Sequence, residues 1–281
     1  MNTNMLKNRS LLNFFLLEFV LSVPFWALSA VTNTVDVFPG LRWGMLWAFT
    51  PMIASLILVF RANKGAGVIE LLKRTYDFRL IKSKIWYLPI FLVNPSFVFV
   101  EYWILRLSGA PIPPPHFSVV IPLFYIMNFF AAYGEELGWT GYAIDPMQER
   151  WSALKSGILL GIAWAGFHIP LFFFDGYSFY WIFWHSLYVV AGRVLLVWVY
   201  NNTGKSMFAM SLFHASFGLY WYLWPIVKWT PTFYDPRILA FNAIFYVTVV
   251  TLLWGPKTLA QYRFARSGGR VSREEQKRAT A

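Results

Sequence analysis

The chain has 281 residues, of which 58% are hydrophobic, 21% aromatic and only 13% charged. A soluble domain usually carries about 25% charged residues, so this composition excludes an ordinary water-soluble fold and indicates a protein surrounded by lipid. The net charge of +11 does not indicate a nucleic-acid partner, because the basic residues lie in short stretches between apolar runs. Cysteine is absent, which excludes disulfides, cysteine–zinc sites and thiol nucleophiles.

Apolar runs that are long enough to cross a bilayer recur along the chain. A spanning helix needs about 20 mostly apolar residues. The runs that qualify are residues 11–31, 43–60, 85–105, 117–138, 157–174, 179–200, 207–224 and 238–254. The sequence therefore predicts an all-α fold, a polytopic transmembrane helical bundle of about eight spans.

The first run follows two basic residues, as a signal peptide would. It is long enough to span the bilayer and contains Glu18, so we interpret it as an uncleaved first span.

The orientation follows from the lysines and arginines. With the N-terminus in the cytoplasm, most of the 24 basic residues fall in internal segments, and Arg193 falls within a span. The external segments hold only Arg42, Arg106, Lys228 and Arg237. This asymmetry predicts an integral membrane protein with both termini in the cytoplasm.

Two adjacent carboxylates stand at the end of the fourth run. Glu135 and Glu136 lie between Gly134 and Gly138, and glycines four apart allow another helix to approach closely. An interfacial cap is the structural alternative. Two charges at a tight helix contact favour a functional site instead, since charges within spans are costly.

The fifth and seventh runs each contain a histidine, His168 and His214. A lone histidine on an apolar helix is often only a hydrogen-bonded core residue. Helical rise places these histidines and Glu135 between roughly 5 and 18 Å from the inner boundary of the membrane. Three groups from three helices at similar depths indicate one buried cavity.

This set of residues suits hydrolysis of an amide. A buried glutamate is a suitable general base for water, and the histidines can orient the water and stabilise an oxyanion. One glutamate and two histidines are also a zinc ligand set, but there is no HExxH motif. Spacing alone leaves a metal site open; the family resemblance described below favours metal-free hydrolysis, with no cofactor.

The three elements resemble the CPBP family of intramembrane glutamic endopeptidases, which includes CAAX proteases and bacteriocin-processing proteins of the Abi group. Its pattern is a Glu-Glu pair with an arginine four residues later, an aromatic residue four before a histidine, and a histidine four before an asparagine. Here the matching residues are Glu135, Glu136, Trp164, His168 and His214. The resemblance implies that Glu135 activates water with support from Glu136, that His168 assists, and that His214 holds the oxyanion.

Two positions depart from the family's pattern. Thr140 stands at the arginine position and Gly218 at the asparagine position. The first departure removes a fixed positive charge, and the second removes an oxyanion donor. Arg193 in the sixth run is a candidate substitute for the missing arginine by pairing with Glu136; the alternative is that it snorkels toward the cytoplasm.

The apolar runs and the polar C-terminal stretch predict a single transmembrane domain over residues 1–266 and a polar cytoplasmic tail at 267–281. The resemblance implies a protease-like core at about 117–224. It implies an endopeptidase in a prokaryotic cell membrane, acting near the cytoplasmic face. The expected substrate is a peptide or protein, either C-terminally prenylated or a bacteriocin precursor. Two alternatives remain open: a catalytically silent binding or self-immunity protein, and a proton-coupled transporter.

Overall fold

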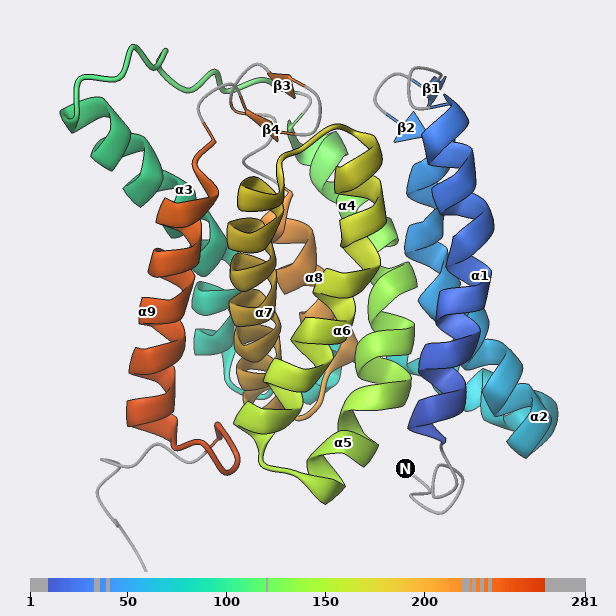
Figure 1. The fold of residues 1–281 in the computed structure, drawn as a ribbon. Coiled ribbons are helices and arrows are strands. Elements are labelled where there is room, and N and C mark those ends of the chain that lie inside the picture. Colours follow the sequence, from blue (N-terminus) through green and yellow to red (C-terminus); the bar gives the residue numbers. More distant parts are fainter. Residues whose placement is uncertain are drawn as a thin grey trace, which may run out of the picture.

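The computed structural model describes residues 10–32, 36–38, 41–119, 121–218, 223, 226–227, 230–231 and 234–260. Within these residues the chain forms a bundle of helices (Figure 1). They are α1 (Leu11–Thr32), α2 (Thr50–Lys73), α3 (Tyr87–Leu107), α4 (Ile121–Gly138), α5 (Asp145–Arg150), α6 (Ala153–Phe174), α7 (Phe179–Asn202), α8 (Met207–Phe217) and α9 (Pro236–Trp254). The predicted helical membrane bundle is confirmed.

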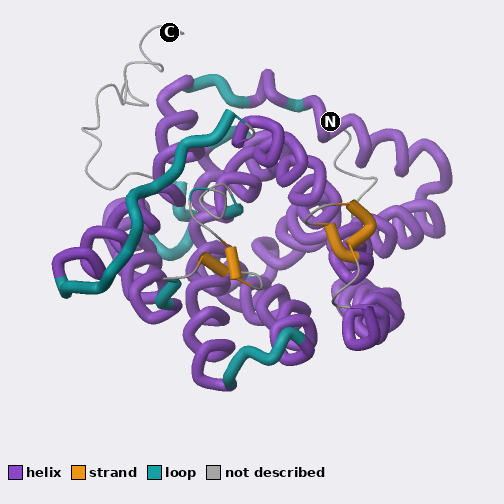
Figure 2. Tube along the Cα trace, turned by 90° about the horizontal axis from the view of Figure 1, so that it is seen from above, coloured by secondary structure: helices purple, strands orange, loops and turns teal. Residues whose placement is uncertain are grey.

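Short segments complete the described chain. The 3-10 segments are η2 (Trp43–Phe49), η3 (Arg74–Tyr76), η4 (Phe78–Leu80) and η5 (Lys84–Trp86), and the π-helical segment η6 (Trp139–Ile144) joins α4 to α5. The sequence did not predict two small antiparallel strand pairs, β1 (Asp36–Phe38) with β2 (Leu41–Arg42) and β3 (Ile226–Val227) with β4 (Thr230–Pro231). Both pairs lie at the end of the bundle opposite α5 (Figures 1 and 2).

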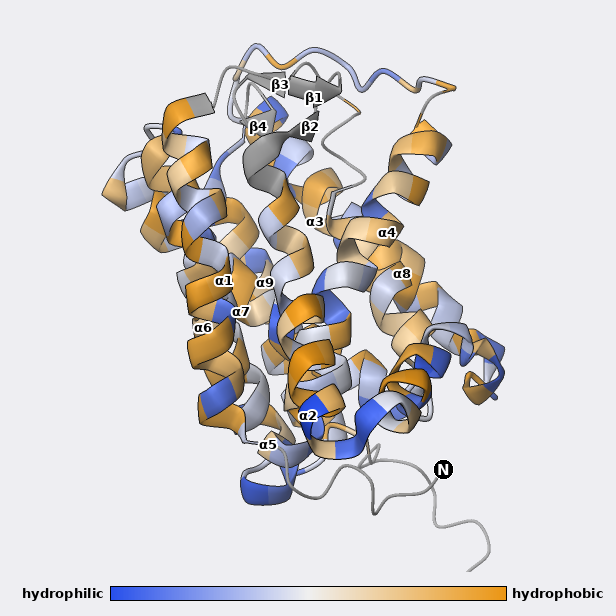
Figure 3. Ribbon diagram, turned by 90° about the vertical axis from the view of Figure 1, so that its right-hand side faces the viewer, coloured by the Kyte–Doolittle hydropathy of each residue, from blue (hydrophilic) through white to orange (hydrophobic). Residues whose placement is uncertain are grey.

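Six described segments are long and apolar enough to cross a membrane: Leu11–Val31, Leu46–Tyr76, Lys84–Leu107, Ala153–Phe174, Phe179–Asn202 and Pro236–Trp254. Hydrophobic residues predominate in the middle of the bundle, and hydrophilic residues gather at its lower end near α2 and α5 (Figure 3). Many of the large hydrophobic side chains are exposed. An apolar surface of this kind is the one that lipid requires.

The predicted spans at 117–138 and 207–224 are not among the six. Polar residues, including Glu135 and Glu136, lower the hydropathy of α4. The seventh prediction is wrong in length, because α8 has 11 residues, about 16 Å, or roughly half the thickness of the hydrocarbon core. Residues 219–222 and 224 of that predicted span lie outside the described residues, as do residues 267–281 of the predicted tail. The division into one domain and a tail stays a prediction.

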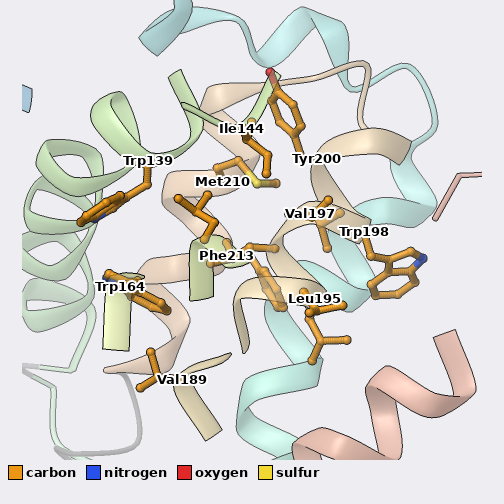
Figure 4. Packing of buried hydrophobic residues seen from close by; sticks show 14 of the residues in the cluster. Trp139, Ile144, Trp164, Val189, Leu195, Val197, Trp198, Tyr200, Met210 and Phe213 are labelled. Carbon is orange, nitrogen blue, oxygen red and sulfur yellow. The ribbon is translucent and has the colours of Figure 1, made fainter. Parts of the chain in front are cut away.

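Helix α7 is the central helix of the bundle. In its apolar 18-residue stretch 72% is buried, whereas in the corresponding stretches of the other candidate spans between 22% and 39% is buried. Leu195, Val197 and Trp198 of α7 pack within the hydrophobic cluster that joins it to its neighbours (Figure 4).

Two glycines of α6 bring this helix against α7. A Cβ atom at Gly157 would lie 3.1 Å from Cα of Val194, and one at Gly161 would lie 2.9 Å from Cα of Val190. Glycines four apart therefore permit backbone contact between the two helices, as at other close helix contacts in membranes. Trp164 follows Gly161 by about one turn of α6, so this contact sets its position relative to α7.

A second pair of glycines four residues apart, Gly134 and Gly138, holds α4 against the start of α2. A Cβ atom at Gly134 would lie 2.6 Å from Cδ1 of Phe49, and one at Gly138 would lie 2.5 Å from the carbonyl oxygen of Pro51. The predicted close approach at these glycines is confirmed. It fixes the segment of α4 that carries the two glutamates.

Candidate active site

Glu136 is bound from three sides and is fully buried. Nη1 of Arg193 donates to both carboxylate oxygens at 2.8 Å, and Nδ1 of His214 lies 2.8 Å from Oε1. The hydroxyl of Thr140, one turn further along, donates to Oε2. Because a carboxylate can only accept hydrogen bonds, Nδ1 of His214 carries the proton of that bond. Glu136 thus joins η6, α7 and α8 to α4.

Arg193 therefore pairs with Glu136 and does not snorkel to the surface. Its side chain is 1% exposed, and Cζ lies 4.1 Å from the centre of the Trp164 ring. A guanidinium held over an indole face gains a cation–π attraction. The positive charge expected at Thr140 in the family is supplied here by Arg193 from another helix.

Glu135 is bound more sparsely. The indole Nε1 of Trp164 donates to Oε2 at 2.6 Å, while Oε1 lies 3.9 Å from Nε2 of His214. A separation of 3.9 Å is too long for a direct hydrogen bond. A water molecule beside this pair can reach both atoms at ordinary hydrogen-bond distances.

His168 approaches the same tryptophan from the next turn of α6. Its Nδ1 lies 2.8 Å from the carbonyl oxygen of Trp164, which can only accept, so Nδ1 carries a proton. Nε2 of the neutral ring is then free to accept a hydrogen bond. The ring centres of His168 and His214 lie 5.3 and 5.0 Å from that of Trp164.

The structure thus brings the candidate residues together around Trp164. Exposure separates them into two groups: the side chains of Glu135 and His214 are 8% and 12% exposed, whereas those of Glu136 and Arg193 are 0% and 1% exposed. The first pair is partly accessible, and the second pair is sealed. Adjacent glutamates therefore have different surroundings because neighbouring residues of a helix face different directions.

The π-helical segment η6 follows directly after the glutamates. Such segments leave the regular hydrogen-bond pattern and often occur at functional sites. The carbonyl oxygen of Gly141 accepts a hydrogen bond from Nη1 of Arg74 at 3.0 Å, and Nη2 of Arg74 donates to the Tyr200 hydroxyl at 2.6 Å. The Tyr200 hydroxyl in turn donates to Asp145 at 3.0 Å. These bonds fasten η6 to α7 on the side where the basic residues gather.

Helix α8, which carries His214, is held at its first turn by a residue from the segment between α2 and α3. The carboxylate of Asp77 accepts hydrogen bonds from the backbone N–H groups of Met207 and Phe208 at 3.0 and 3.1 Å. It also accepts one from the hydroxyl of Ser206 at 2.8 Å. A carboxylate is favourable at this helix end, where N–H groups lack partners within the helix.

Gly218 ends α8 and has no side chain to donate a hydrogen bond. A Cβ atom there would lie 2.5 Å from Nδ2 of Asn128. The space next to Gly218 is therefore taken by an amide from α4. Sequence reasoning missed Asn128, although it is a polar residue in an apolar run seven positions before Glu135.

Glu18 of α1 is a further buried carboxylate that no motif singled out. Its Oε1 accepts hydrogen bonds from Thr50 at 2.9 Å and Ser22 at 3.2 Å, and it is fully buried. Its place inside a span was visible in the sequence. Its partners were not, because Thr50 comes from the next helix.

No group of three metal-ligating side chains is found among the residues that the structure describes. The oxygens of Glu136 are engaged by Arg193, His214 and Thr140.

Comparison with known proteins agrees with this geometry. Residues 117–220 match the sequence model of the family described as "Type II CAAX prenyl endopeptidase Rce1-like". The chain is also 26% identical over 262 residues to "CAAX prenyl protease 2" of Methanococcus maripaludis, a match that covers 87% of this chain and 93% of that protein. The segment matched to the family contains both glutamates, both histidines and Arg193. The resemblance predicted from the three motifs is confirmed: the chain is similar to the Rce1-like CAAX prenyl endopeptidases over the segment that carries these residues.

Proposed function

We propose that the protein is an intramembrane endopeptidase in which Glu135 activates a water molecule for attack on a peptide bond. The observation that carries this proposal is the convergence of Glu135, His168 and His214 on Trp164. Ionisable groups between spanning helices are costly and usually serve function. The similarity to a CAAX prenyl protease supports peptide hydrolysis as the reaction class.

The water would be held by Oε1 of Glu135 beside Nε2 of His214, 3.9 Å away, with His168 as a further hydrogen-bond acceptor. Oε2 of Glu135 is engaged by Trp164, so Oε1 is the oxygen that accepts a proton from the water. Nε2 of His168 accepts a hydrogen bond from the second O–H of the water. This nitrogen is available because the proton of the neutral ring is on Nδ1, which faces the backbone carbonyl of Trp164. This arrangement aims a lone pair of the water oxygen at the substrate carbonyl.

The reaction then follows without a covalent enzyme intermediate. The water oxygen bonds to the carbonyl carbon while its proton moves to Oε1 of Glu135. The carbonyl oxygen becomes an oxyanion and accepts a hydrogen bond from Nε2–H of His214, and Glu136 holds Nδ1 of the same ring in place. When the C–N bond breaks, Glu135 returns the proton to the leaving nitrogen.

The substrate class follows from the similarity and from the charge distribution. A relative named as a CAAX prenyl protease supports a prenylated peptide C-terminus as the substrate, and a bacteriocin precursor is the alternative. The excess of internal lysine and arginine supports cleavage near the cytoplasmic face of a prokaryotic cell membrane, with both termini on that side.

The test compares purified wild-type protein with Glu135→Gln on a farnesylated peptide, its unprenylated form and a peptide library. Loss of the general base should lower kcat by about 10² to 10⁴. Glu149→Gln is the matched control, because Glu149 is an exposed glutamate beyond the site on α5. Its kcat should equal that of the wild type.

A chelator separates the glutamate mechanism from a metal mechanism. Cleavage that persists in the chelator and disappears in Glu135→Gln supports the proposal. Cleavage that the chelator abolishes supports a metal-dependent hydrolase. If the wild type cleaves none of the peptides, the proposed function is wrong. The hypothesis of a catalytically silent binding or self-immunity protein is then favoured.

A further inference from the structure

Asn128 carries a buried amide donor that has no hydrogen-bond partner. Its Nδ2 atom is inaccessible and unpaired within the part of the chain that the structure describes. Burying an amide donor without a partner is unfavourable, and nearly all such groups in proteins are paired. A donor of this kind next to a reaction centre points to a partner that is present only when substrate is bound.

The position of Asn128 ties it to the candidate active site from two directions. On α4 it precedes Glu135 by seven residues, which is two helical turns, so both side chains lie on one face. The two Cα atoms are about 10 Å apart along the axis by helical rise.

The second direction runs through α8. Nδ2 of Asn128 would lie 2.5 Å from a Cβ atom at Gly218, and Gly218 follows His214 by about one turn. The amide therefore lies next to the helix end that carries His214. The glycine leaves room for this amide, because any side chain at 218 would collide with it.

We propose that substrate binding displaces the packing that covers the Asn128 amide, which then donates a hydrogen bond to the oxyanion that forms during peptide hydrolysis, as a second donor beside His214. This inference rests on the proposed function. When the water oxygen bonds to the carbonyl carbon, the carbonyl oxygen takes the electron pair of its π bond, and Nδ2–H of Asn128 binds this charge. When the C–N bond breaks, the electron pair returns to the carbonyl and the hydrogen bond weakens.

The first experiment measures kcat, KM and thermal unfolding of Asn128→Leu in detergent. Loss of one oxyanion donor should lower kcat by about 10² to 10³ with KM unchanged, since the bond strengthens only in the transition state. The unfolding temperature should stay the same or rise, because no bond of the resting protein is lost. Asn242→Leu on α9 is the control; its amide donates to Phe97 at 3.5 Å, and its kcat should match the wild type.

The second experiment moves the donor to the other helix. Gly218→Asn alone should be impaired, because the new side chain meets the Asn128 amide. The double variant Asn128→Ala/Gly218→Asn places one amide in the same space and should recover at least tenfold in kcat over Asn128→Ala. A purely structural role for Asn128 does not predict this recovery.

The outcomes separate this inference from the proposed function. An active wild type with Asn128→Leu equal to it overturns the inference alone and leaves the peptidase intact. An Asn128→Leu variant that loses stability and activity together, with no recovery in the double variant, assigns Asn128 to packing and also overturns it. A wild type that cleaves no peptide overturns the proposed function and this inference with it.

Discussion

Nη1 of Arg193 lies 2.8 Å from both carboxylate oxygens of Glu136, and both side chains are sealed from solvent. The pair joins the central helix α7 to the helix that carries the candidate general base. A buried ion pair of this kind stabilises a protein only while both partners are present, because either charge alone is left uncompensated.

The first prediction concerns this pair. Arg193→Leu should destabilise the protein by about 3 to 5 kcal/mol and abolish cleavage, since it leaves Glu136 charged and buried. Thermal unfolding in detergent measures the loss. The double variant Arg193→Leu/Glu136→Leu should be more stable than Arg193→Leu, because the uncompensated charge is gone. If Arg193→Leu changes neither the unfolding temperature nor the rate of cleavage, the pair does not have this role.

The second prediction concerns Trp164 as the hydrogen-bond donor to Glu135. Trp164→Phe keeps an aromatic ring and removes Nε1, which should cost about 1.5 to 3 kcal/mol, as for other hydrogen bonds to charged groups. Glu135 then loses its fixed orientation, so kcat should fall at least tenfold. Trp103→Phe, at a tryptophan that is 45% exposed, should change neither quantity. Equal kcat values for the two variants would contradict this role.

The third prediction concerns the cap of α8. Asp77→Ala removes the acceptor of two backbone N–H groups and should cost about 0.5 to 2 kcal/mol. Cleavage should fall as well, because the helix that carries His214 is no longer fixed at its start. Asp77→Asn retains one capping oxygen and replaces the other with an NH2 group, so it should lie between the wild type and Asp77→Ala in both unfolding temperature and kcat. A loss in Asp77→Asn as large as in Asp77→Ala would show that the charge, and not the cap, matters.

The fourth prediction uses two glycines with opposite surroundings. A Cβ atom at Gly138 would lie 2.5 Å from the backbone oxygen of Pro51, whereas one at Gly166 meets nothing within 4 Å. Gly138→Ala should therefore push α4 from α2, lower stability and reduce cleavage. Gly166→Ala should stabilise α6 by about 0.5 to 1 kcal/mol, because alanine favours a helix. Similar unfolding temperatures for the two variants would argue against the close contact at Gly138.

The sequence predicted the membrane bundle and the convergence of the site because both depend on local patterns. Apolar runs mark spans, and an ionisable residue within such a run is conspicuous whatever its partners. Glu135, His168 and His214 were recognisable for this reason, and their order along the chain matched a family motif. The geometry of Gly134 and Gly138 followed from their spacing alone.

What the sequence could not give were contacts between distant segments. Thr50 binds Glu18 and Arg74 binds the carbonyl of Gly141, and nothing near these residues in the chain indicates a partner. The short length of α8 was also missed, since hydropathy does not reveal where a helix stops inside an apolar run. For Arg193 the sequence gives only an approximate depth in the membrane, and this depth is compatible both with pairing to Glu136 and with snorkelling to the surface.

The unequal attachment of the two adjacent glutamates has a practical consequence. Glu136 binds side chains from several helices, so a variant that is inactivated at Glu136 should also be destabilised. Among the described residues, the carboxylate of Glu135 accepts a hydrogen bond from Trp164 alone, and Glu135→Gln keeps an oxygen to accept it. Glu135→Gln should therefore give a folded but inactive protein that still binds its natural peptide. Such a variant can be used to capture and identify that peptide.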